Sequence, residues 1–212
     1  MDVYKTEEEQ IEAIKKWWAE NGKAVAFGVA VGLIAVFGWR GWQSHIVKQT
    51  GAASGLYQQL MVSIREGKDD EGRTRAEKVV NEYGDTTYAV LARMMLAKYA
   101  VADKDLDKAA DYLRAAMKKS GQESLQLEIR LRLAEVLKEK QDYDQALKLL
   151  DIQQRGAFDD RYEELKGDIF VAKGDTTRAV DAYREAMIKA RAASRDVSLL
   201  EMKMDDLGQN VQ

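Results

Sequence analysis

The feature that most constrains this chain of 212 residues is a run of sixteen residues without a charged side chain, from Ala24 to Trp39. A membrane span usually needs about 18 residues or more and a buried core helix about 10–14, so length alone leaves both open. The run is apolar on every side at helical period, so no face of such a helix would prefer water. We therefore predict a transmembrane helix over residues 23–43, with a buried core helix as the alternative.

Aromatic and basic residues bracket the run, as they do where membrane helices meet water. The predicted interfacial anchors are Trp17, Trp18, Lys23, Trp39, Arg40 and Trp42. Within the run, Ala24, Gly28 and Gly32 recur every four residues and would let another helix approach closely. We predict a helix–helix contact on this face, with a second copy or another subunit, although glycine is common in membrane helices in any case.

The segments that flank the run favour an uncleaved signal anchor over a cleaved signal peptide. A long, partly acidic tail precedes the run, and the small residues that a cleavage site requires do not follow it. Residues 1–23 carry four lysines, whereas residues 40–62 carry one arginine and one lysine. Because positive charge stays on the cytoplasmic side, we predict a cytoplasmic tail (1–22) and a domain on the far side of the membrane (44–212).

The tail is predicted to form an amphipathic helix from Glu7 to Glu20. Residues 6–9 fit a capping box, and Asn21-Gly22 is the predicted stop. One face carries Ile11, Ile14 and Trp18, so the helix would lie along the cytoplasmic surface of the bilayer. A merely solvated helix is the alternative, since the glutamates of the first turns would be repelled by anionic lipid.

Residues 44–212 alternate amphipathic segments with glycine or aspartate breaks and contain no proline, which favours helices joined by short turns. Small residues that we expect to pack where two antiparallel helices cross recur as Ala97 with Ala109, Ala134 with Ala146, and Gly167 with Ala179. The second members, together with a weaker copy at Ala76, lie 33, 37 and 33 residues apart. An aspartate four residues earlier supplies an N-cap in three copies: Asp105, Asp142 and Asp175.

This period and pattern match the tetratricopeptide repeat, and an unrelated array of α-hairpins is the alternative. The predicted fold is therefore all-α: an amphipathic helix, one transmembrane helix and a tetratricopeptide-like helical-hairpin solenoid. A C-terminal capping helix over residues 196–207 would close the solenoid with an apolar face of Val197, Leu200, Met204 and Leu207.

The concave face of such an array is the expected binding surface. The candidate residues are Met94, Lys98, Glu128, Leu131, Glu135, Lys138, Arg161, Glu164 and Asp168. Their mixed charges and apolar members suit a broad, weak protein contact, whereas a site that clamps carboxylates would gather Lys, Arg and Asn. Ordinary solvated helix faces are the alternative for each residue.

Composition excludes most chemistry. The chain has no cysteine, and its single histidine, His45, adjoins the run beside Ser44, so neither zinc nor Ser-His-Asp chemistry is indicated. No phosphate-binding or dinucleotide-binding glycine loop occurs. With 33 Lys and Arg against 36 Asp and Glu, the net charge is −3, which argues against a nucleic-acid partner. We predict no enzyme activity, no cofactor and no metal.

Three segments carry a resemblance to a known family: AENGKA from Ala19 to Ala24, the glycine-bearing run, and GWRGWQSH from Gly38 to His45. Followed by tetratricopeptide-like repeats, they resemble the YfgM family of ancillary subunits of the bacterial SecYEG translocon. The resemblance implies one inner-membrane helix and a periplasmic repeat domain. It also implies association with PpiD, a membrane-anchored chaperone of the prolyl-isomerase type, and passage of newly translocated chains to periplasmic chaperones. The cytoplasmic tail of the family is associated with restraint of an envelope-stress response regulator.

Three functions follow as hypotheses. The first is a membrane-tethered interaction module beside the translocon, which meets translocating or unfolded envelope proteins and has the lipid bilayer as its anchor. The second is a regulator of an envelope-stress response that acts through the cytoplasmic tail. The third is a scaffold of an envelope assembly complex that recruits lipoproteins through its repeats.

Overall fold

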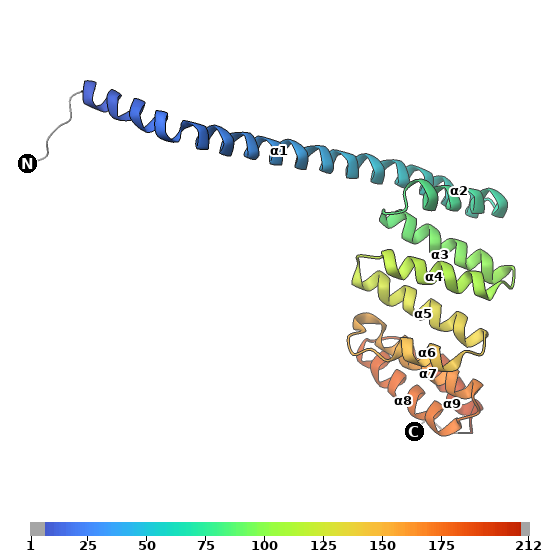
Figure 1. Cartoon of the computed structure of the whole chain (residues 1–212). Coiled ribbons are helices and arrows are strands. Elements are labelled where there is room, and N and C mark those ends of the chain that lie inside the picture. The colour runs from blue at the N-terminus through green and yellow to red at the C-terminus, as the bar shows by residue number, and fades with distance from the viewer. Residues whose placement is uncertain (1–6, 209–212) are drawn as a thin grey trace, which may run out of the picture. The chain divides into compact units, whose positions relative to one another are not determined.

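The computed structural model describes residues 7–208, which form helices and contain no β-strand. The elements are α1 (Glu7–Arg65), α2 (Asp69–Glu82), α3 (Thr87–Ala102), α4 (Leu106–Lys119), α5 (Glu123–Glu139), α6 (Tyr143–Leu150), the 3-10 turn η1 (Gly156–Phe158), α7 (Asp159–Ala172), α8 (Thr176–Ala192) and α9 (Ser198–Asp206), most of which are labelled in Figure 1. The chain divides into two compact units, with the boundary between Gln49 and Thr50. The predicted all-α fold is confirmed.

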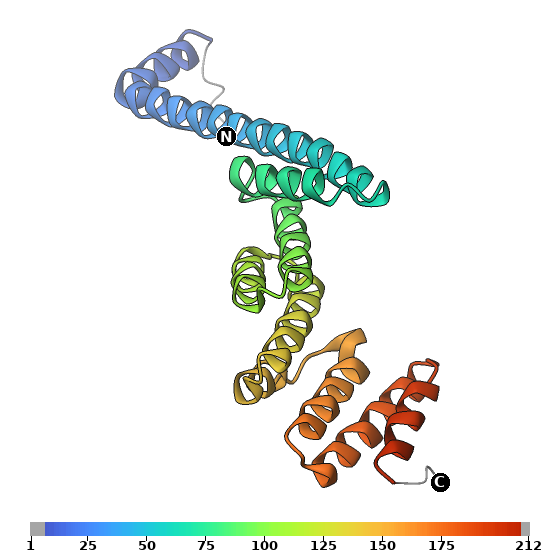
Figure 2. The ribbon, with the colours of Figure 1, turned by 90° about the vertical axis from the view of Figure 1, so that its right-hand side faces the viewer.

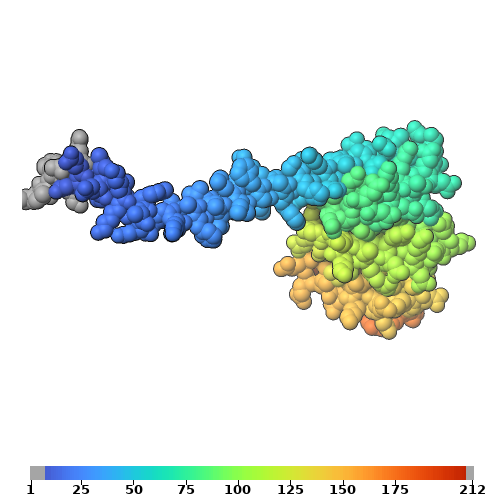
Figure 3. Space-filling view, turned by 45° about the horizontal axis from the view of Figure 1, so that its top comes forward, coloured from blue at the N-terminus to red at the C-terminus, as the bar shows by residue number. Residues whose placement is uncertain are grey.

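The first unit is the N-terminal part of α1, and its apolar side chains face outward. Phe27, Ile34 and Phe37 have exposed fractions of 73%, 73% and 65%. In Figure 3 the side chains of this blue segment protrude on both edges, with no other helix of the unit over them. α1 is long and apolar enough to cross a membrane. Since these side chains are uncovered, the segment does not behave as the core helix that we considered as an alternative.

The predicted stop at Asn21-Gly22 is wrong, because α1 continues through both residues. The Asn21 side-chain amide donates a hydrogen bond to the Trp17 carbonyl at 3.0 Å, so it supports the helix instead of ending it. Gly22 lies under the Trp18 indole, which a Cβ atom at this position would approach to 3.2 Å. Figures 1 and 2 show that the dark blue part of α1 bends without a break. Thr6 of the predicted capping box lies outside the described residues.

The second unit begins within α1, and its helices stack as antiparallel hairpins (Figure 1). The last turns of α1 pack with α2, and the pairs α3–α4, α5–α6 and α7–α8 follow, with α9 against α8. Compared with the predicted boundary at residues 43 and 44, the compact units divide six residues later. The limits of the membrane-spanning segment, 23–43, stay a prediction.

The three predicted N-cap aspartates occupy that position at the start of α4, α6 and α8. Each side chain accepts a hydrogen bond from the backbone N–H three residues on, at 3.0, 3.4 and 3.0 Å. The residue before each cap has a left-handed backbone, with φ of 63° at Lys104, 63° at Gln141 and 76° at Gly174. This repeated turn sets the hairpin geometry, because a left-handed residue ends one helix just before the cap starts the next.

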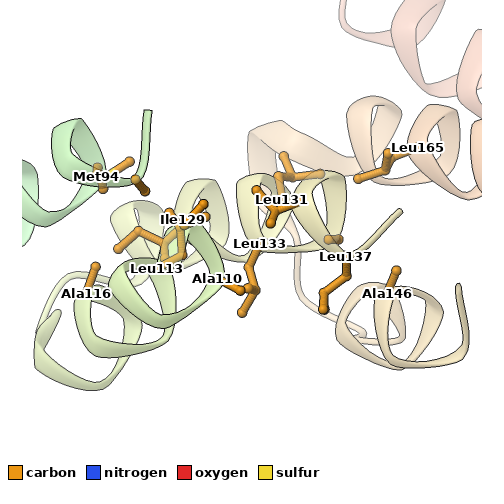
Figure 4. Close-up of a cluster of buried hydrophobic side chains, with 14 of the residues drawn as sticks. Met94, Ala110, Leu113, Ala116, Ile129, Leu131, Leu133, Leu137, Ala146 and Leu165 are labelled. Carbon is orange, nitrogen blue, oxygen red and sulfur yellow. The ribbon is translucent and has the colours of Figure 1, made fainter. Parts of the chain in front are cut away.

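Side chains of the second unit pack in three clusters instead of one core. One joins α1, α2 and α3, the largest joins α3 to α7, and the third joins α8 and α9. Figure 4 shows the largest, in which Leu131 lies on the side of α5 that faces α7, where Leu165 points toward it. Tyr162 donates a hydrogen bond to the Leu127 carbonyl at 2.9 Å, and burial raises the pKa of its phenol to about 12. Each hairpin thus depends on its neighbours, as in a solenoid.

Candidate protein-binding face

The small residues predicted at the helix crossings all lie inside the second unit. Ala97, Ala109, Ala134, Ala146, Gly167 and Ala179 are buried. Gly167 on α7 is the tightest position, since a Cβ atom there would lie 2.3 Å from Cε1 of Tyr183 on α8. The missing side chain leaves room for the tyrosine ring, whose hydroxyl donates to Asp168 Oδ1 at 2.8 Å. These contacts fix the spacing of the helices that carry the candidate face.

A surface hollow of about 270 Å³ lies among α3, α4, α5 and α7. Five of the nine candidate residues line it: Met94, Lys98, Glu128, Glu135 and Arg161. The other lining residues are Ala97, Val101, Leu113, Arg132 and Val136, of which the sequence analysis named only Ala97, and that for packing. Arg132 could have been found, because it follows Glu128 by four residues and therefore shares its helix face.

Glu128 holds the charged wall of this hollow together. Its carboxylate pairs with Arg132 Nε at 3.0 Å on its own helix and with Arg161 on α7 at 2.9 Å. Burial alone would raise the pKa of Glu128, but the hydrogen bonds and charges of the two arginines outweigh it and hold this pKa below its usual range. The wall is therefore a preformed ion triad that joins neighbouring repeats.

Glu135, two turns along α5 from Glu128, is in a different state. Partial burial among the lining residues raises the pKa of its carboxyl, and the nearby charges of Arg161 and Arg132 only oppose that rise. Glu135 is exposed, so water still reaches its carboxyl. The carboxylate makes no ion pair with any residue of the described chain.

Four candidate residues lie elsewhere. Leu131 has an exposed fraction of 1% and packs in the core, so we correct its assignment to the binding face. Glu164 and Asp168 both pair with Lys203 Nζ of α9 at 2.7 Å, and are thus occupied by the C-terminal helix. Lys138 is half-buried beside Glu139 at 3.5 Å and does not line the hollow. A helix-face pattern could not reveal these partners, because Lys203 belongs to a helix predicted only as a cap.

A second hollow, of about 590 Å³, lies among α6, α7 and α8. Its lining includes Phe170 and Arg178. The guanidinium carbon of Arg178 lies over the Phe170 ring, 4.6 Å from the ring centroid. No residue of this hollow was predicted as a site. The hollow lies where one repeat has a short second helix. α6 ends four residues after Ala146, whereas the equivalent helix α8 continues for thirteen residues after Ala179.

The capping helix α9 buries Leu200 and Met204 against α8, with Val197 and Leu207 partly covered. Its outer side also carries apolar side chains, since Leu199 and Met202 have exposed fractions of 57% and 64%. Among residues 7–208, no group of three or more His, Asp or Glu side chains is placed to hold a metal ion.

Comparison with known proteins finds similarity over nearly the whole chain. A family model described as a tetratricopeptide repeat-like domain matches residues 15–209. The ancillary SecYEG translocon subunit of Escherichia coli K12 is 37% identical over 207 residues, which cover 98% of this chain and 99% of the relative. Proteins of the same name from Haemophilus influenzae and Aggregatibacter actinomycetemcomitans are 33% and 34% identical, over 97% and 95% of this chain and 100% and 97% of their own lengths. The chain belongs to the YfgM family.

In this YfgM-family member, the tryptophans among the predicted anchors and the predicted small residues of α1 are not covered by other described residues. Trp17, Trp18, Trp39 and Trp42 are more than half exposed, at 52%, 57%, 68% and 64%. A Cβ atom added at Gly28 or Gly32 would meet nothing within 4 Å, so this face is unoccupied by other described residues. The predicted contact of Ala24, Gly28 and Gly32 with another helix remains a prediction, as do the interfacial roles of Lys23 and Arg40.

Proposed function

We propose that this chain is a membrane-anchored accessory subunit of the SecYEG translocon, whose repeat domain binds proteins and catalyses no reaction. The observation that carries the proposal is the match, over nearly the full length, to relatives named ancillary SecYEG translocon subunits. The exposed apolar segment of α1 supports an inner-membrane location. The hollow among α3, α4, α5 and α7 supports a protein-binding role for the repeats.

We further propose a cytoplasmic N-terminus and a periplasmic repeat domain, because the lysines of residues 1–23 outnumber the basic residues that follow the run. On the periplasmic side the repeats would meet translocated, still unfolded chains and a PpiD-type chaperone. Tethering beside the channel raises the effective concentration of the binding face, so a weak contact suffices. Protease treatment of spheroplasts tests the orientation: cleavage of the repeat domain supports it, and protection of that domain contradicts it.

A photocrosslinking residue in the span tests the association with the translocon. We expect a crosslinker at Gly28 to capture a SecY, SecE or SecG subunit at native expression, because the small-residue face admits a close helix. Ala30 is the matched control, since two residues turn the helix by about 200° and direct the crosslinker away. Equal capture from both positions would contradict a specific helix contact, and capture of no translocon subunit from either would contradict the proposed function.

A second crosslinker, at Lys98 on the rim of the hollow, tests the binding face. We expect capture of translocating envelope proteins or of a PpiD-type chaperone from this position. Lys118, which is exposed on α4 and outside the hollow, is the control. Stronger capture from Lys118 than from Lys98 would move the binding face away from the hollow.

The tail supports a second candidate function. Ile11, Ile14 and Trp18 are exposed on α1, with exposed fractions of 52%, 66% and 57%. This stripe could bind a cytoplasmic response regulator of the envelope-stress response. Exchange of residues 1–22 for an unrelated tail would then change stress-dependent transcription and leave crosslinking at Gly28 intact. Unchanged transcription would remove this second function.

A further inference from the structure

Where the apolar run ends, α1 carries a hollow of about 560 Å³ on one of its faces. Each lining residue lies three or four positions from another, so all of them share one side of a helix with 3.6 residues per turn. The lining residues are Trp39, Arg40, Gln43, Ser44, Val47 and Lys48. Apart from Val47, every one of these side chains carries a hydrogen-bond donor, and two carry a positive charge. The hollow is therefore a surface rich in donors at the end of the predicted span.

No carboxylate balances the two positive charges along the helix. Residues 21–65 include no Asp and no Glu. Arg40 and Lys48 are exposed, and neither forms an ion pair within the described part of the first unit, residues 7–49. In the hollow of the repeat domain, by contrast, arginines and carboxylates neutralise one another. Because the charge on this face of α1 has one sign, the face favours an anionic ligand.

The spacing of the donors suits a phosphate group. Arg40 and Ser44 lie one turn apart, about 6 Å along the helix axis, and Lys48 lies about 6 Å further on. The guanidinium matches the geometry of a phosphate, and a hydroxyl can donate to another of its oxygens. The long side chains of Arg40 and Lys48 can extend from both sides toward a group beside Ser44. One phosphodiester can thus contact both cations and the hydroxyl.

The same face of α1 continues into the apolar run. Val36, Leu33 and Val29 precede Arg40 by four, seven and eleven residues, so they lie in line with it along the helix. All three side chains are exposed. Acyl chains would pack on these side chains while a phosphate lies at the level of Arg40, whereas a free anion would make no use of them. The continuous face therefore favours a phospholipid over a soluble phosphate.

We propose that this face of α1 binds an anionic phospholipid, with its phosphate held by Arg40, Ser44 and Lys48. Phosphatidylethanolamine also has a phosphate, but its ammonium group would lie beside two cations and would find no carboxylate on residues 21–65. Phosphatidylglycerol has hydroxyl groups in place of the ammonium, so the site selects lipids of this type. The inference rests on the membrane anchor of the proposed function.

The lipid and a partner helix can occupy α1 together. Val29, on the face that continues into the lipid site, follows Gly28 by one residue, which turns the helix by about 100°. The predicted small-residue face of Ala24, Gly28 and Gly32 is therefore left free by the lipid. A bound lipid would lie beside the helix contact and would not compete with it.

Native mass spectrometry of the full chain in detergent micelles tests the selection. The probes are dioleoylphosphatidylglycerol and dioleoylphosphatidylethanolamine, which have the same acyl chains, and glycerol 3-phosphate, a soluble anion without acyl chains. We expect the dissociation constant for the phosphatidylglycerol to be about tenfold lower than that for the phosphatidylethanolamine, as one charge-assisted hydrogen bond allows. Glycerol 3-phosphate should not be retained.

Two variants assign the preference to the site. The double variant Arg40→Gln and Lys48→Gln removes both cations from exposed positions and should bring the two dissociation constants close together. Lys23→Gln is the matched control, because it removes an exposed cation from the other end of the run. Glu20 lies one turn from Lys23 on the same helix, so a carboxylate is available there, and the preference should persist in this variant.

Equal binding of the two lipids would overturn the inference and would leave Arg40 and Lys48 to an acidic segment of a partner protein. A preference that survives the double substitution would also overturn it, as would one that Lys23→Gln abolishes. Binding of glycerol 3-phosphate as tight as that of phosphatidylglycerol would assign the site to a free anion instead.

Carbonate extraction separates this inference from the proposed function. The apolar run is intact in the double variant, so this variant should stay in the membrane pellet whether or not the lipid preference is lost. Release of the unsubstituted chain would contradict the membrane anchor, and with it the proposed function, whatever the lipid preference.

Discussion

Gly167 on α7 and Tyr183 on α8 show how a single residue sets the distance between two helices. A Cβ atom at position 167 would lie 2.3 and 2.4 Å from two ring carbons of Tyr183, too close for any side chain without a shift of the helices. We expect Gly167→Ala to lower the free energy of unfolding by about 1–3 kcal/mol, as overpacking does. Gly121→Ala is the control, since a Cβ atom there meets nothing within 4 Å. Urea unfolding measures both, and an unaffected Gly167→Ala would contradict the tight crossing.

The left-handed turns before the N-caps offer a gain in stability. Gln141 has a φ of 63°, a backbone conformation that costs a residue with a Cβ about 1–2 kcal/mol, whereas glycine already occupies the equivalent position at Gly174. Gln141→Gly should therefore raise the free energy of unfolding by about 0.5–1 kcal/mol, after the larger loss of chain entropy by glycine is subtracted. Gly174→Ala should have the opposite sign. Thermal unfolding of both variants checks the pair, and a destabilised Gln141→Gly would refute it.

The sequence could predict the role of single residues where that role depends on neighbours in the same turn or the same repeat. The aspartate caps follow from their position four residues before Ala109, Ala146 and Ala179, and Gly167 follows from the same repeat register. Leu131 could not be assigned correctly, because the helices that start each hairpin are buried on two sides, and a simple apolar stripe does not describe them. Glu164 and Asp168 could not be assigned because their partner, Lys203, comes from a distant helix.

Among the elements, the connection from α6 to α7 depends on one arginine. Arg155 Nε donates a hydrogen bond to the Ile152 carbonyl at 2.7 Å. The guanidinium carbon of Arg155 lies 5.5 Å from the centroid of the Tyr162 ring, and the guanidinium also forms an ion pair with Glu163. Glu163 also accepts a hydrogen bond from Lys166 at 3.1 Å. Burial would raise the pKa of Glu163, but the hydrogen bonds from Arg155 and Lys166 outweigh it and lower this pKa.

This lowered pKa makes part of the stability depend on pH. A carboxyl whose pKa is lower in the folded state stabilises the fold above its unfolded pKa of about 4.3, and that contribution is lost as pH falls through the folded pKa. We expect the difference in unfolding free energy between the unsubstituted chain and Glu163→Gln to shrink as pH is lowered from about 6 to about 3. Ser124→Ala, which changes an exposed residue of α5 whose side chain does not titrate, is the control and should give a difference that does not vary with pH. A difference for Glu163→Gln that stays constant with pH would contradict the assignment.

Helix boundaries show where sequence patterns compete with local bonding. Asn21-Gly22 is a common helix stop, yet the Asn21 amide finds its acceptor within α1, so the stop signal has no effect. The glycine break at Gly156 was visible, but the sequence did not predict that α6 would end at Leu150, because the residues that follow are held by Arg155 and not by a cap.

For the whole molecule, retention in the membrane is the property that the apolar run should control. Arginine at the centre of a membrane helix costs about 2.5–3.5 kcal/mol, so the double variant Val31→Arg and Ile34→Arg, both close to the centre of the predicted span, should lose about 5–7 kcal/mol of insertion free energy. We expect most of this variant to be released by carbonate, while the unsubstituted chain stays in the membrane pellet. Ile188→Arg, which changes an exposed residue of α8, is the control and should remain in the pellet. Release of the unsubstituted chain would refute the anchor.

Separate clusters in place of a single core also affect how the chain reaches its folded state. Leu60, Ala76, Ala89 and Leu96 close the first cluster with residues that precede the last hundred of the sequence. With the topology that we propose, the residues that follow the anchor cross the membrane first. They can therefore complete that cluster while the C-terminal half is still being threaded, since nearest-neighbour repeats need no distant contacts to nucleate. The domain would then fold one hairpin at a time, starting next to the anchor. The hairpin folded last would provide the apolar surface on which the next hairpin packs.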